Sequence, residues 1–392
     1  MKTISILSIT GLAVLSIGSV QASEQSYLYK DQRIMAMGGA NVAVGGYSTS
    51  LFSNPAGVAK ISNDHGMVVE LLGLQLGSST DSQDLINDLS DAIDSGNENE
   101  ILDVFNDYSG QTVHIDVSNY SSISNNHGTI AWSVGLLSAV DANFTAHGNS
   151  FGLLDTQARA YGGLTGAMSY TFKPFDNGDD LSVGLGLKMI TQQSYEGTIT
   201  PAELINFDDI ENTLEEKYEK DGTAFSADLG AIYQFNDTYL TPSIGLSILN
   251  IGELDFDGSY GSQPMTVNIG ASIEPEFIYA KKTIIAIDYV DLLNENSTRS
   301  YNIGSGETVT YTDTEDSDVL KRLRFGVSSL LYENTWSSFT VAAGLYQGSY
   351  TAGFSLTASI LQIGFTTYEE QLGPQFDDQS DRRYSVNAGL VW

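Results

Sequence analysis

The sequence predicts an all-β protein: a single transmembrane antiparallel β-barrel of about 14 strands, with an N-terminal plug in its lumen and helical insertions in its external loops. Three observations predict this fold. Segments of about ten residues alternate in polarity from Met67 onward, the connections between them alternate in length, and the last segment ends on an aromatic residue, Trp392. A mean hydropathy of -0.09 fits a membrane barrel, because only alternate residues face lipid.

The alternation has the period of two that is expected of strands with one apolar face. In residues 183–189, apolar side chains at the odd positions alternate with glycine and lysine at the even positions. Closed membrane barrels of bacteria require an even number of such strands. We expect them near residues 67–77, 112–118, 128–146, 157–173, 180–194, 222–236, 239–250, 264–274, 280–290, 318–331, 335–347, 349–357, 359–370 and 382–392.

The connections between these strands are alternately long and short, apart from a short one at residues 347–349. The short ones include residues 236–238 and 332–334. Outer-membrane barrels have short periplasmic turns and long external loops, so the alternation predicts the outer membrane of a Gram-negative bacterium. The long connections include residues 78–111, 195–221, 251–263 and 291–317.

Two of the long connections contain helical patterns. In residues 81–106, apolar side chains recur at the spacing of one helix face, and Pro201 can begin a second helix within residues 201–219. A third stretch, residues 311–318, is acidic and is expected to be solvated. Its carboxylates suit Ca²⁺, but their spacing is not that of an EF-hand, so a solvated loop is the preferred interpretation; they are Asp313, Glu315, Asp316 and Asp318.

Residues 1–22 have the pattern of a secretory signal peptide. Lys2 precedes an apolar run, and Val20-Gln21-Ala22 forms a cleavage site before Ser23. The alternative is a transmembrane anchor, but no basic stop-transfer cluster follows the run. We therefore divide the chain into a signal peptide (1–22), an N-terminal plug (23–60) and an outer-membrane β-barrel (61–392).

Composition excludes several classes of function. The chain has no Cys, which excludes disulfides, thiol catalysis and metal binding through Cys. Asp and Glu number 49 against 17 Lys and Arg, and the resulting charge of -32 argues against nucleic acid as a partner. A Gly-x-Ser-x-Gly match at residues 148–152 lies in a turn between strands, where the nucleophile elbow does not occur. The four histidines are scattered; they are His65, His114, His127 and His147. We expect no enzymatic activity, no cofactor and no metal.

The stretch from Arg33 to Ala59 is too rich in glycine for a stable helix and too small-sided for a good strand. We expect it to lie as irregular chain inside the barrel, because a bore of about 14 strands is too wide for its own side chains to fill. The alternative is a periplasmic linker that leads to a first short strand. The predicted plug residues are Gly38, Gly39, Ala40, Asn54, Pro55, Ala56 and Gly57.

Two further sets of residues are assigned by their place in the predicted strands. Inward-facing charged residues are expected to line the lumen and to pair there; they are Lys188, Asp228 and Asp288. Alternate residues of the last strand are expected to form one face, which the barrel assembly machinery reads as its signal; they are Tyr384, Val386, Leu390 and Trp392.

Residues 37–44 (MGGANVAV) followed by Asn54-Pro55-Ala56-Gly57 resemble the N-terminal signature of FadL-like outer-membrane proteins. Residues 344–348, 366–373 and 381–384 are most similar to the proteins known as TraF-like conjugal transfer proteins. The resemblance implies a barrel of about 14 strands with an N-terminal hatch. It also implies a hydrophobic small-molecule ligand that reaches the membrane laterally through a defect in the wall.

The first functional hypothesis is therefore passive transport of small hydrophobic molecules across the outer membrane. The alternative is a structural or accessory component of a conjugation or secretion apparatus, and an outer-membrane hydrolase is a weaker third. A continuous apolar groove from the loops into the lumen favours transport, and a sealed polar lumen favours the accessory role. Outer-membrane lipid, lipopolysaccharide and the barrel assembly machinery are the expected partners.

Overall fold

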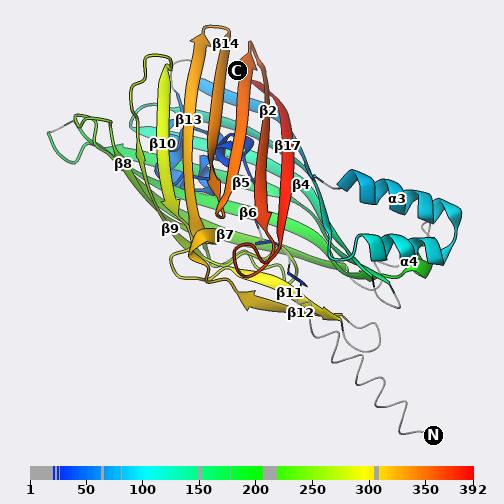
Figure 1. Cartoon of the computed structure of the whole chain (residues 1–392). Coiled ribbons are helices and arrows are strands. Elements are labelled where there is room, and N and C mark those ends of the chain that lie inside the picture. The colour runs from blue at the N-terminus through cyan, green and yellow to red at the C-terminus, as the bar shows by residue number, and fades with distance from the viewer. Residues whose placement is uncertain are drawn as a thin grey trace, which may run out of the picture.

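The computed structural model describes residues 21–22, 24–25, 27–62, 66–80, 82–148, 152–176, 178–205, 219–303 and 309–392. Within them, fourteen antiparallel strands form one closed barrel, in which β17 pairs with β2 (Figure 1). The predicted fold class is confirmed. The strands are β2 (Met67–Ser79), β3 (Thr112–Asn126), β4 (Ile130–His147), β5 (Leu153–Phe172), β6 (Asp180–Ile199), β7 (Glu219–Gln234), β8 (Ser243–Ile251), β9 (Thr266–Ile273), β10 (Lys282–Tyr289), β13 (Leu323–Asn334), β14 (Ser337–Tyr346), β15 (Ser349–Ala358), β16 (Leu361–Gln371) and β17 (Ser380–Val391).

Each of the fourteen predicted strands corresponds to one observed strand, but some boundaries were wrong. The strand predicted at 112–118 continues to Asn126. The strand predicted at 318–331 begins only at Leu323, because Asp318 caps a short helix, α7 (Val319–Arg322). The side chain of Asp318 accepts a hydrogen bond from the Leu320 amide at 2.8 Å, which favours a helix start over an extended chain.

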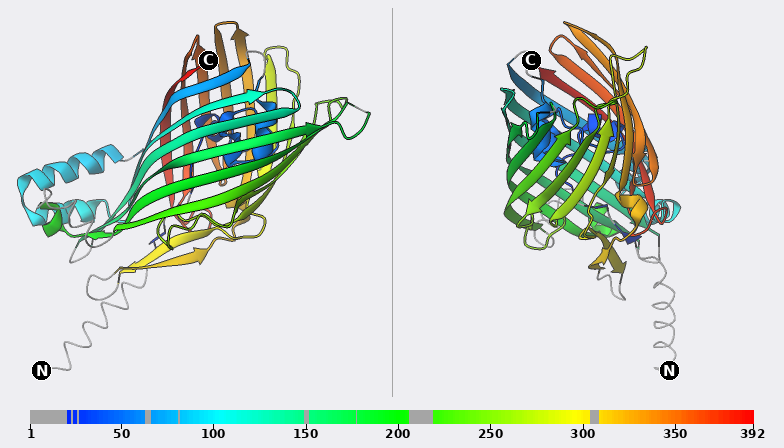
Figure 2. Two further views of the ribbon diagram at one scale, coloured as in Figure 1. Left: turned by 180° about the vertical axis from the view of Figure 1, so that it is seen from behind. Right: turned by 90° about the vertical axis from the view of Figure 1, so that its left-hand side faces the viewer.

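The barrel has a short-turn end, where the C-terminus lies, and a long-loop end (Figures 1 and 2). The predicted helical insertion at 81–106 is two helices, α3 (Ser82–Ser95) and α4 (Glu98–Asp107), separated at Gly96, which has a φ of 68°. A third helix, α5 (Pro201–Ile205), begins at the expected proline; residues 206–218 lie outside the described part of the chain. Among the described residues, no helix is both long and apolar enough to cross a membrane.

The connection between β10 and β13 is not the plain loop that was expected. Two antiparallel strands pair there, β11 (Ser297–Ile303) and β12 (Val309–Glu315), and β1 (Gln21–Ala22) pairs with β11 to make a three-stranded sheet; residues 304–308 lie outside the described part of the chain. Part of the acidic stretch 311–318, which overlaps β12, is not solvated. Asp316 is fully buried and forms an ion pair of 2.5 Å with Lys321, so the prediction for this residue was wrong.

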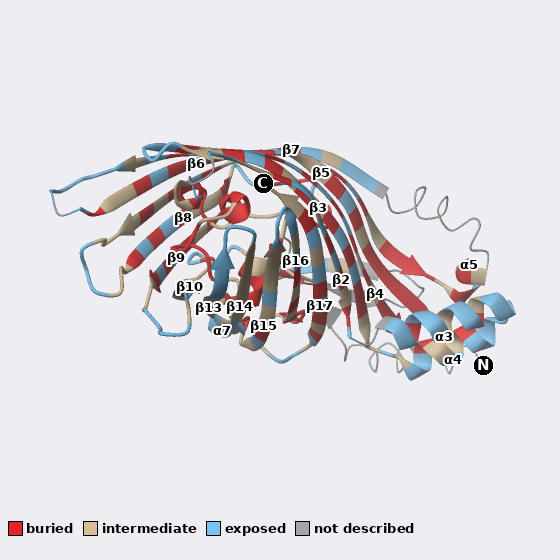
Figure 3. Cartoon of the chain, turned by 90° about the horizontal axis from the view of Figure 1, so that it is seen from above, coloured by how far each residue is buried: buried red, intermediate tan, exposed pale blue. Residues whose placement is uncertain are grey.

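The two faces of the wall differ as the sequence pattern predicts. Along β6, Leu185, Leu187 and Met189 are exposed on the outer surface, whereas Lys188 is buried on the inner side. The same alternation of buried and exposed residues is visible on most strands of the barrel (Figure 3). An apolar outer band around a polar interior is the arrangement of membrane barrels.

The N-terminal segment lies inside the barrel (Figure 2). It contains a short helix, α2 (Gln32–Ala36), and two 3₁₀ helices, η1 (Ser48–Phe52) and η2 (Pro55–Lys60). The helix contacts β14 to β17 on one side of the lumen, and η2 contacts β3 to β7 on the other. The chain then reaches the short-turn end, where β2 begins. The structure therefore agrees with a lumenal segment and not with a first barrel strand before residue 61.

Deleting Trp392 should reduce the amount of folded barrel in the membrane several-fold, whereas Trp336→Ser should leave it nearly unchanged. The backbone of Trp392 exchanges two hydrogen bonds with Val69, at 2.8 and 3.1 Å, across the seam that closes the barrel. Trp336 lies in a turn with 71% of its surface exposed. The heat-modifiable band on a gel measures the folded fraction, and equal levels of the two variants contradict the expectation.

Candidate functional site

The candidate functional site is the interface between the plug, residues 23–60, and the inner wall of the barrel. Glycines of the wall make this contact possible. On eight strands, a Cβ atom at one glycine would come within 3.0 Å of a plug atom or of a residue that holds the plug, so a larger residue does not fit there. These glycines are Gly184, Gly230, Gly245, Gly270, Gly326, Gly344, Gly353 and Gly364.

The predicted plug residues lie at the closest approaches. Gly38 and Gly39 have φ values of 65° and 76°, and a Cβ on Gly38 would meet the Phe325 carbonyl oxygen at 2.1 Å. Ala40 and Ala56 are fully buried. Gly57 lies against Gly45, where a Cβ would meet the Cα of Gly45 at 2.9 Å. At these positions the chain can run this close to its neighbours because glycine and alanine carry little or no side chain.

Asn54 and Pro55 fix the turn that leads into η2. The Asn54 Oδ1 atom accepts from the Ala56 amide at 3.0 Å, and Pro55 occupies the first helical position. The Asn54 Nδ2 atom donates to the Val42 carbonyl at 2.7 Å and to the Ala231 carbonyl of β7 at 3.2 Å. One side chain thus joins two parts of the plug to the wall.

The three predicted lumen residues are all buried, and Asp288 is hydrogen-bonded to the plug. Its Oδ2 atom accepts hydrogen bonds from the Asn41 and Val42 amides at 2.6 and 2.8 Å. Lys188 and Asp228 form an ion pair of 3.0 Å with each other, and Asn250 bonds to both. Asp288 therefore anchors the plug, whereas Lys188 and Asp228 join neighbouring wall strands.

A cluster of buried ion pairs holds the part of the plug nearest the long-loop end. Arg383 of β17 pairs with Glu24 at 2.5 Å and with Asp381 at 2.7 Å. Lys30 pairs with Glu370 of β16 at 2.6 Å and with Glu24 at 3.4 Å. Removing one partner of a buried pair leaves an uncompensated charge, which costs several kcal/mol, about 3–5. The sequence pattern did not predict these ion pairs, although Asp381 and Arg383 occupy inward positions of the last strand.

The plug residues of this cluster remain charged. Burial alone would lower the pKa of the Lys30 ammonium, but the carboxylates of Glu370 and Glu24 outweigh it and raise that pKa well above its usual range. Burial alone would raise the pKa of Glu24, but the Arg383 and Lys30 cations outweigh it and hold that pKa below its usual range. The two charges that the plug contributes to this cluster therefore persist at neutral pH.

On the β3–β7 side of the lumen, the plug makes apolar contacts beside two buried ion pairs of the wall, Arg159 with Asp141 and Lys188 with Asp228. There the plug packs against the inner faces of β3 to β7, and two residues of the β8–β9 loop join the contact. Tyr29, Phe52 and Tyr120 form a group of three rings with centroids 5.4–5.6 Å apart. We call this set the lumenal apolar cluster; it contains Leu28, Leu51, Val58, Ile61, Tyr120, Leu137, Tyr161, Ile190, Ala224, Leu254 and Phe256.

The wall is irregular where β2 passes this cluster. Between Glu70 and Gly73 the register of β2 shifts against β3, and it also shifts against β17. Leu72 at this bulge has a φ of 50° and is 65% exposed on the outer surface. A cavity of about 30 Å³ lies behind the bulge, next to Tyr29 and to the ion pair between Arg33 and Glu70.

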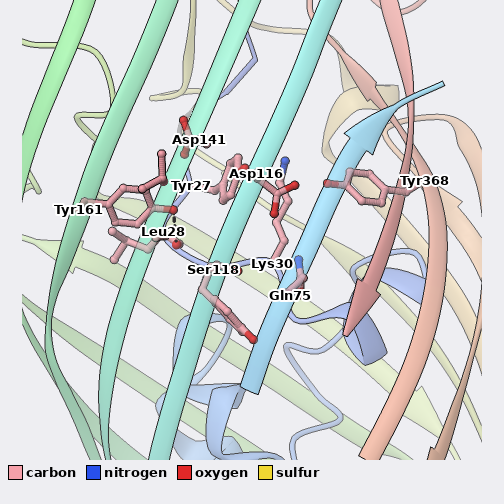
Figure 4. A pocket seen from close by; sticks show the side chains of 12 residues that line it. Tyr27, Leu28, Lys30, Gln75, Asp116, Ser118, Asp141, Tyr161 and Tyr368 are labelled. Atoms are coloured by element: carbon pink, nitrogen blue, oxygen red, sulfur yellow. Dashed lines mark hydrogen bonds between the residues drawn. The ribbon is translucent and has the colours of Figure 1, made fainter. Parts of the chain in front are cut away.

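The lumen is narrow along the plug. A cavity of about 10 Å³ separates plug residues 27–30 from β2 to β5, and Asp116, Asp141 and Tyr161 line it (Figure 4). Asp141 is held by Arg159, whose Nε atom lies 2.7 Å from Oδ2. A space of this size holds about one water molecule. In this structure the lumen is closed here to any larger solute.

Three of the four histidines lie in the described part of the chain. His114 is fully buried between Asn143, at 2.8 Å from Nδ1, and Asp116, at 3.3 Å from Nε2. His147 is also buried, His127 is exposed, and His65 lies outside the described residues. In the described part of the chain, no group of three or more His, Asp or Glu side chains is arranged to hold a metal ion. Three residues of the Gly-x-Ser-x-Gly match, 149–151, are outside that part.

These features define a class: a closed barrel of fourteen antiparallel strands whose N-terminal segment fills the lumen. A family model described as "F plasmid transfer operon, TraF, protein" matches residues 51–288, more than half of the chain. The chain belongs to this family. No curated protein matches it in sequence.

Solved structures with the same fold include transporters of aromatic hydrocarbons. The Pseudomonas putida toluene transporter TodX is 11% identical with a TM-score of 0.52, covering 94% of this chain and 98% of its own. The Ralstonia pickettii toluene transporter TbuX is 12% identical with a TM-score of 0.50, covering 93% and 97%. A TodX mutant described as a monoaromatic hydrocarbon channel is 11% identical with a TM-score of 0.54, covering 92% and 98%. At 11–12% identity, these similarities show that the fold is shared.

Gly184→Val should displace the plug while leaving the barrel folded. A Cβ at this position would meet only plug backbone, with the Ala56 nitrogen at 2.3 Å and the Pro55 carbonyl carbon at 2.4 Å. Overpacking costs about 1–3 kcal/mol, and rigid backbone offers little relief. Trypsin should then cleave at Arg33 or Lys60 at least tenfold faster, as measured by mass spectrometry of the fragments.

Gly166→Val is the matched control for this experiment. Gly166 lies on the adjacent strand β5, and a Cβ there would have no neighbour closer than 3.6 Å. Its cleavage rate should equal that of the wild type. Equal protection of the plug in the two variants argues against tight seating of the plug on the wall glycines.

Proposed function

We propose that this protein is an outer-membrane channel through which small apolar molecules pass passively. One observation carries the proposal: the lumenal apolar cluster extends from the β8–β9 loop at the long-loop end to Tyr29 and Tyr120 behind the bulge of β2. The cluster gives an apolar solute a continuous set of contacts that it can share or replace. The fold shared with the toluene transporters supports the same function.

The proposed path begins among the long loops and follows the β3–β7 side of the lumen. A solute enters by exchanging places with apolar side chains of the plug and the loops, at little cost, since one apolar contact replaces another. It leaves at the bulge of β2, where the register shifts interrupt the ladder to both neighbouring strands. The opposite side, with its buried ion pairs, keeps the plug attached during this movement.

The proposed setting is the outer membrane of a Gram-negative bacterium. The signal peptide directs export, the barrel assembly machinery inserts the chain, and lipid and lipopolysaccharide surround its apolar outer face. No reaction is assigned to the protein. Its residues contribute a sealed wall, a movable plug and an apolar path.

The second candidate function is an accessory role in a conjugation or secretion apparatus. The closed lumen, with cavities of about 10 and about 30 Å³ along the plug, favours it, and so does the description of the family. An accessory barrel needs no solute path, and its function should not depend on whether the plug is seated or displaced. The two functions therefore differ in what happens when the plug is removed or when an apolar solute is offered.

Removing residues 24–59 should leave a folded barrel whose single-channel conductance is at least tenfold higher. The first barrel strand begins at Met67, so the deletion breaks no hydrogen bond of the wall ladder. Planar-bilayer recordings of the refolded full-length and truncated proteins measure the change. A folded truncation with unchanged low conductance counts against the plug.

Cells that produce the full-length protein should take up radiolabelled toluene faster than cells that lack it, because lipopolysaccharide slows apolar solutes. Uptake of a polar solute of similar size, such as glycerol, should be unchanged. If both kinds of cell take up toluene at the same rate, the transport function is contradicted and the accessory role is favoured.

A further inference from the structure

The loop between β8 and β9 folds into the barrel. We call residues 252–263 the mouth loop. Leu254 and Phe256 are essentially completely buried, and Tyr260 is 3% exposed, whereas the acidic residues between them, Asp255 and Asp257, face outward. Leu254 and Phe256 belong to the lumenal apolar cluster together with wall residues Tyr161, Ile190 and Ala224. An external loop thus places a benzyl group inside the barrel.

Neutral hydrogen bonds hold most of the mouth loop. Gln192 donates to the Tyr260 carbonyl at 2.6 Å, and Asn143 donates to the Tyr260 hydroxyl oxygen at 2.9 Å. Among the described residues, the charged donor to this loop is Arg159, whose Nη1 atom lies 3.5 Å from the Gly261 carbonyl oxygen and whose guanidinium is already paired with Asp141. Water can replace such bonds. The plug, by contrast, is held by buried ion pairs that water replaces poorly.

The backbone of the mouth loop is also in disfavoured conformations. Glu253 and Asp257 have φ values of 63° and 56°, in the left-handed region that residues with a Cβ adopt at a cost. Gly252, Gly258 and Gly261 are left-handed as well, with φ values of 92°, 67° and 98°. The inward position therefore depends on the burial of Leu254 and Phe256, and a competing apolar group at the same place releases the loop.

We propose that the place occupied by Leu254 and Phe256 is a binding site for one small aromatic hydrocarbon molecule, and that the mouth loop leaves the lumen when this ligand binds. The expected size of the ligand follows from the Phe256 side chain that it replaces, because this side chain is a single six-membered ring with one substituent carbon. Tyr161, Ile190 and Ala224 are uncharged, and the nearby Arg159 guanidinium, 4.5 Å from the Tyr161 ring centroid, is already paired with Asp141. This inference rests on the proposed transport function and identifies the first site that a solute occupies on the proposed path.

The helices at the same end of the barrel show that an outward loop can bury its apolar residues elsewhere. Phe105 of α4 is fully buried, but it packs in a separate cluster with Ile101, Leu154 and Leu204, outside the lumen. The mouth loop instead joins the cluster that reaches plug residue Leu28. Its aromatic ring lies on the path that the solute is proposed to follow.

A reversible crosslink tests whether the mouth loop must move. A Cβ on Gly222 would lie 3.3 Å from the Cβ of Phe256, close to the separation of disulfide-bonded residues. The chain has no Cys, so Gly222→Cys with Phe256→Cys creates one defined pair. Cells that produce this variant should take up radiolabelled toluene at least fivefold faster after reduction by dithiothreitol than in the oxidised state. Wild-type cells should show no effect of dithiothreitol.

A size series at Phe256 tests the site without a crosslink. Phe256→Ala should raise toluene uptake about threefold to tenfold because the ligand no longer displaces a ring, and Phe256→Trp should lower it by a similar factor. Phe105→Ala removes an equally buried ring outside the lumen and should leave uptake at the wild-type rate. Heat-modifiable gel bands confirm that each variant is folded.

The outcomes separate the site from the function. If wild-type cells take up toluene but neither the crosslink nor the Phe256 series changes the rate, transport stands and the mouth-loop site is overturned. If neither the wild type nor any folded variant raises toluene uptake above that of cells without the protein, both the transport function and the mouth-loop site are contradicted.

Discussion

A backbone amide or carbonyl in the interior of a bilayer has no water to bond with, so each crossing strand needs a partner on both sides. This chain meets the constraint by pairing β17 with β2. Closing fourteen strands leaves a bore that the wall side chains do not fill, and the N-terminal segment occupies it. The plug needs room of its own, which is why eight strands carry a glycine where it passes. Closure, plug and wall glycines are thus successive consequences of one requirement.

Filling the bore with polar chain creates a second requirement, that buried charges and amides be satisfied. The wall and the plug meet it together: Asp288 accepts two plug amides, and Lys30 and Glu24 pair with Glu370 and Arg383 of the last two strands. Because each group depends on its partner, the plug is held at defined points and not by shape alone. The ion pairs between plug and wall lie on the side of β16 and β17, whereas on the side of β3 to β7 the plug makes apolar contacts and its backbone accepts neutral or charge-assisted hydrogen bonds.

The sequence predicted all fourteen strands of the wall, because a strand with one face in lipid alternates apolar and polar residues with a strict period of two. The same period predicted that Lys188, Asp228 and Asp288 face the lumen. The high content of small residues in the N-terminal segment predicted that this segment forms the plug. The sequence did not reveal the pairing of Lys30 with Glu370, since those residues are 340 positions apart. It also missed β11 and β12 and the inward turn of the mouth loop. In a loop over the barrel mouth, neighbouring residues can face the lumen or the solvent within a few positions, so its sequence shows neither the period of a strand nor that of a helix clearly.

The division of the lumen into two sides bears directly on the transport that we propose. A hydrocarbon can take the place of Leu or Phe side chains, but it cannot replace the partner of a buried charge, because the remaining ion would lose its compensation. Passage is therefore restricted to the apolar contacts of the lumenal apolar cluster, between Phe256 near the long-loop end and the bulge at Leu72. Ion pairs also lie beside this path, Arg159 with Asp141 in the wall and Arg33 with Glu70 at the bulge, and the solute has to pass without separating them. The ion pairs of Lys30 and Glu24 hold the plug while its apolar contacts are exchanged, so that a barrel closed to water and ions can still admit an apolar solute.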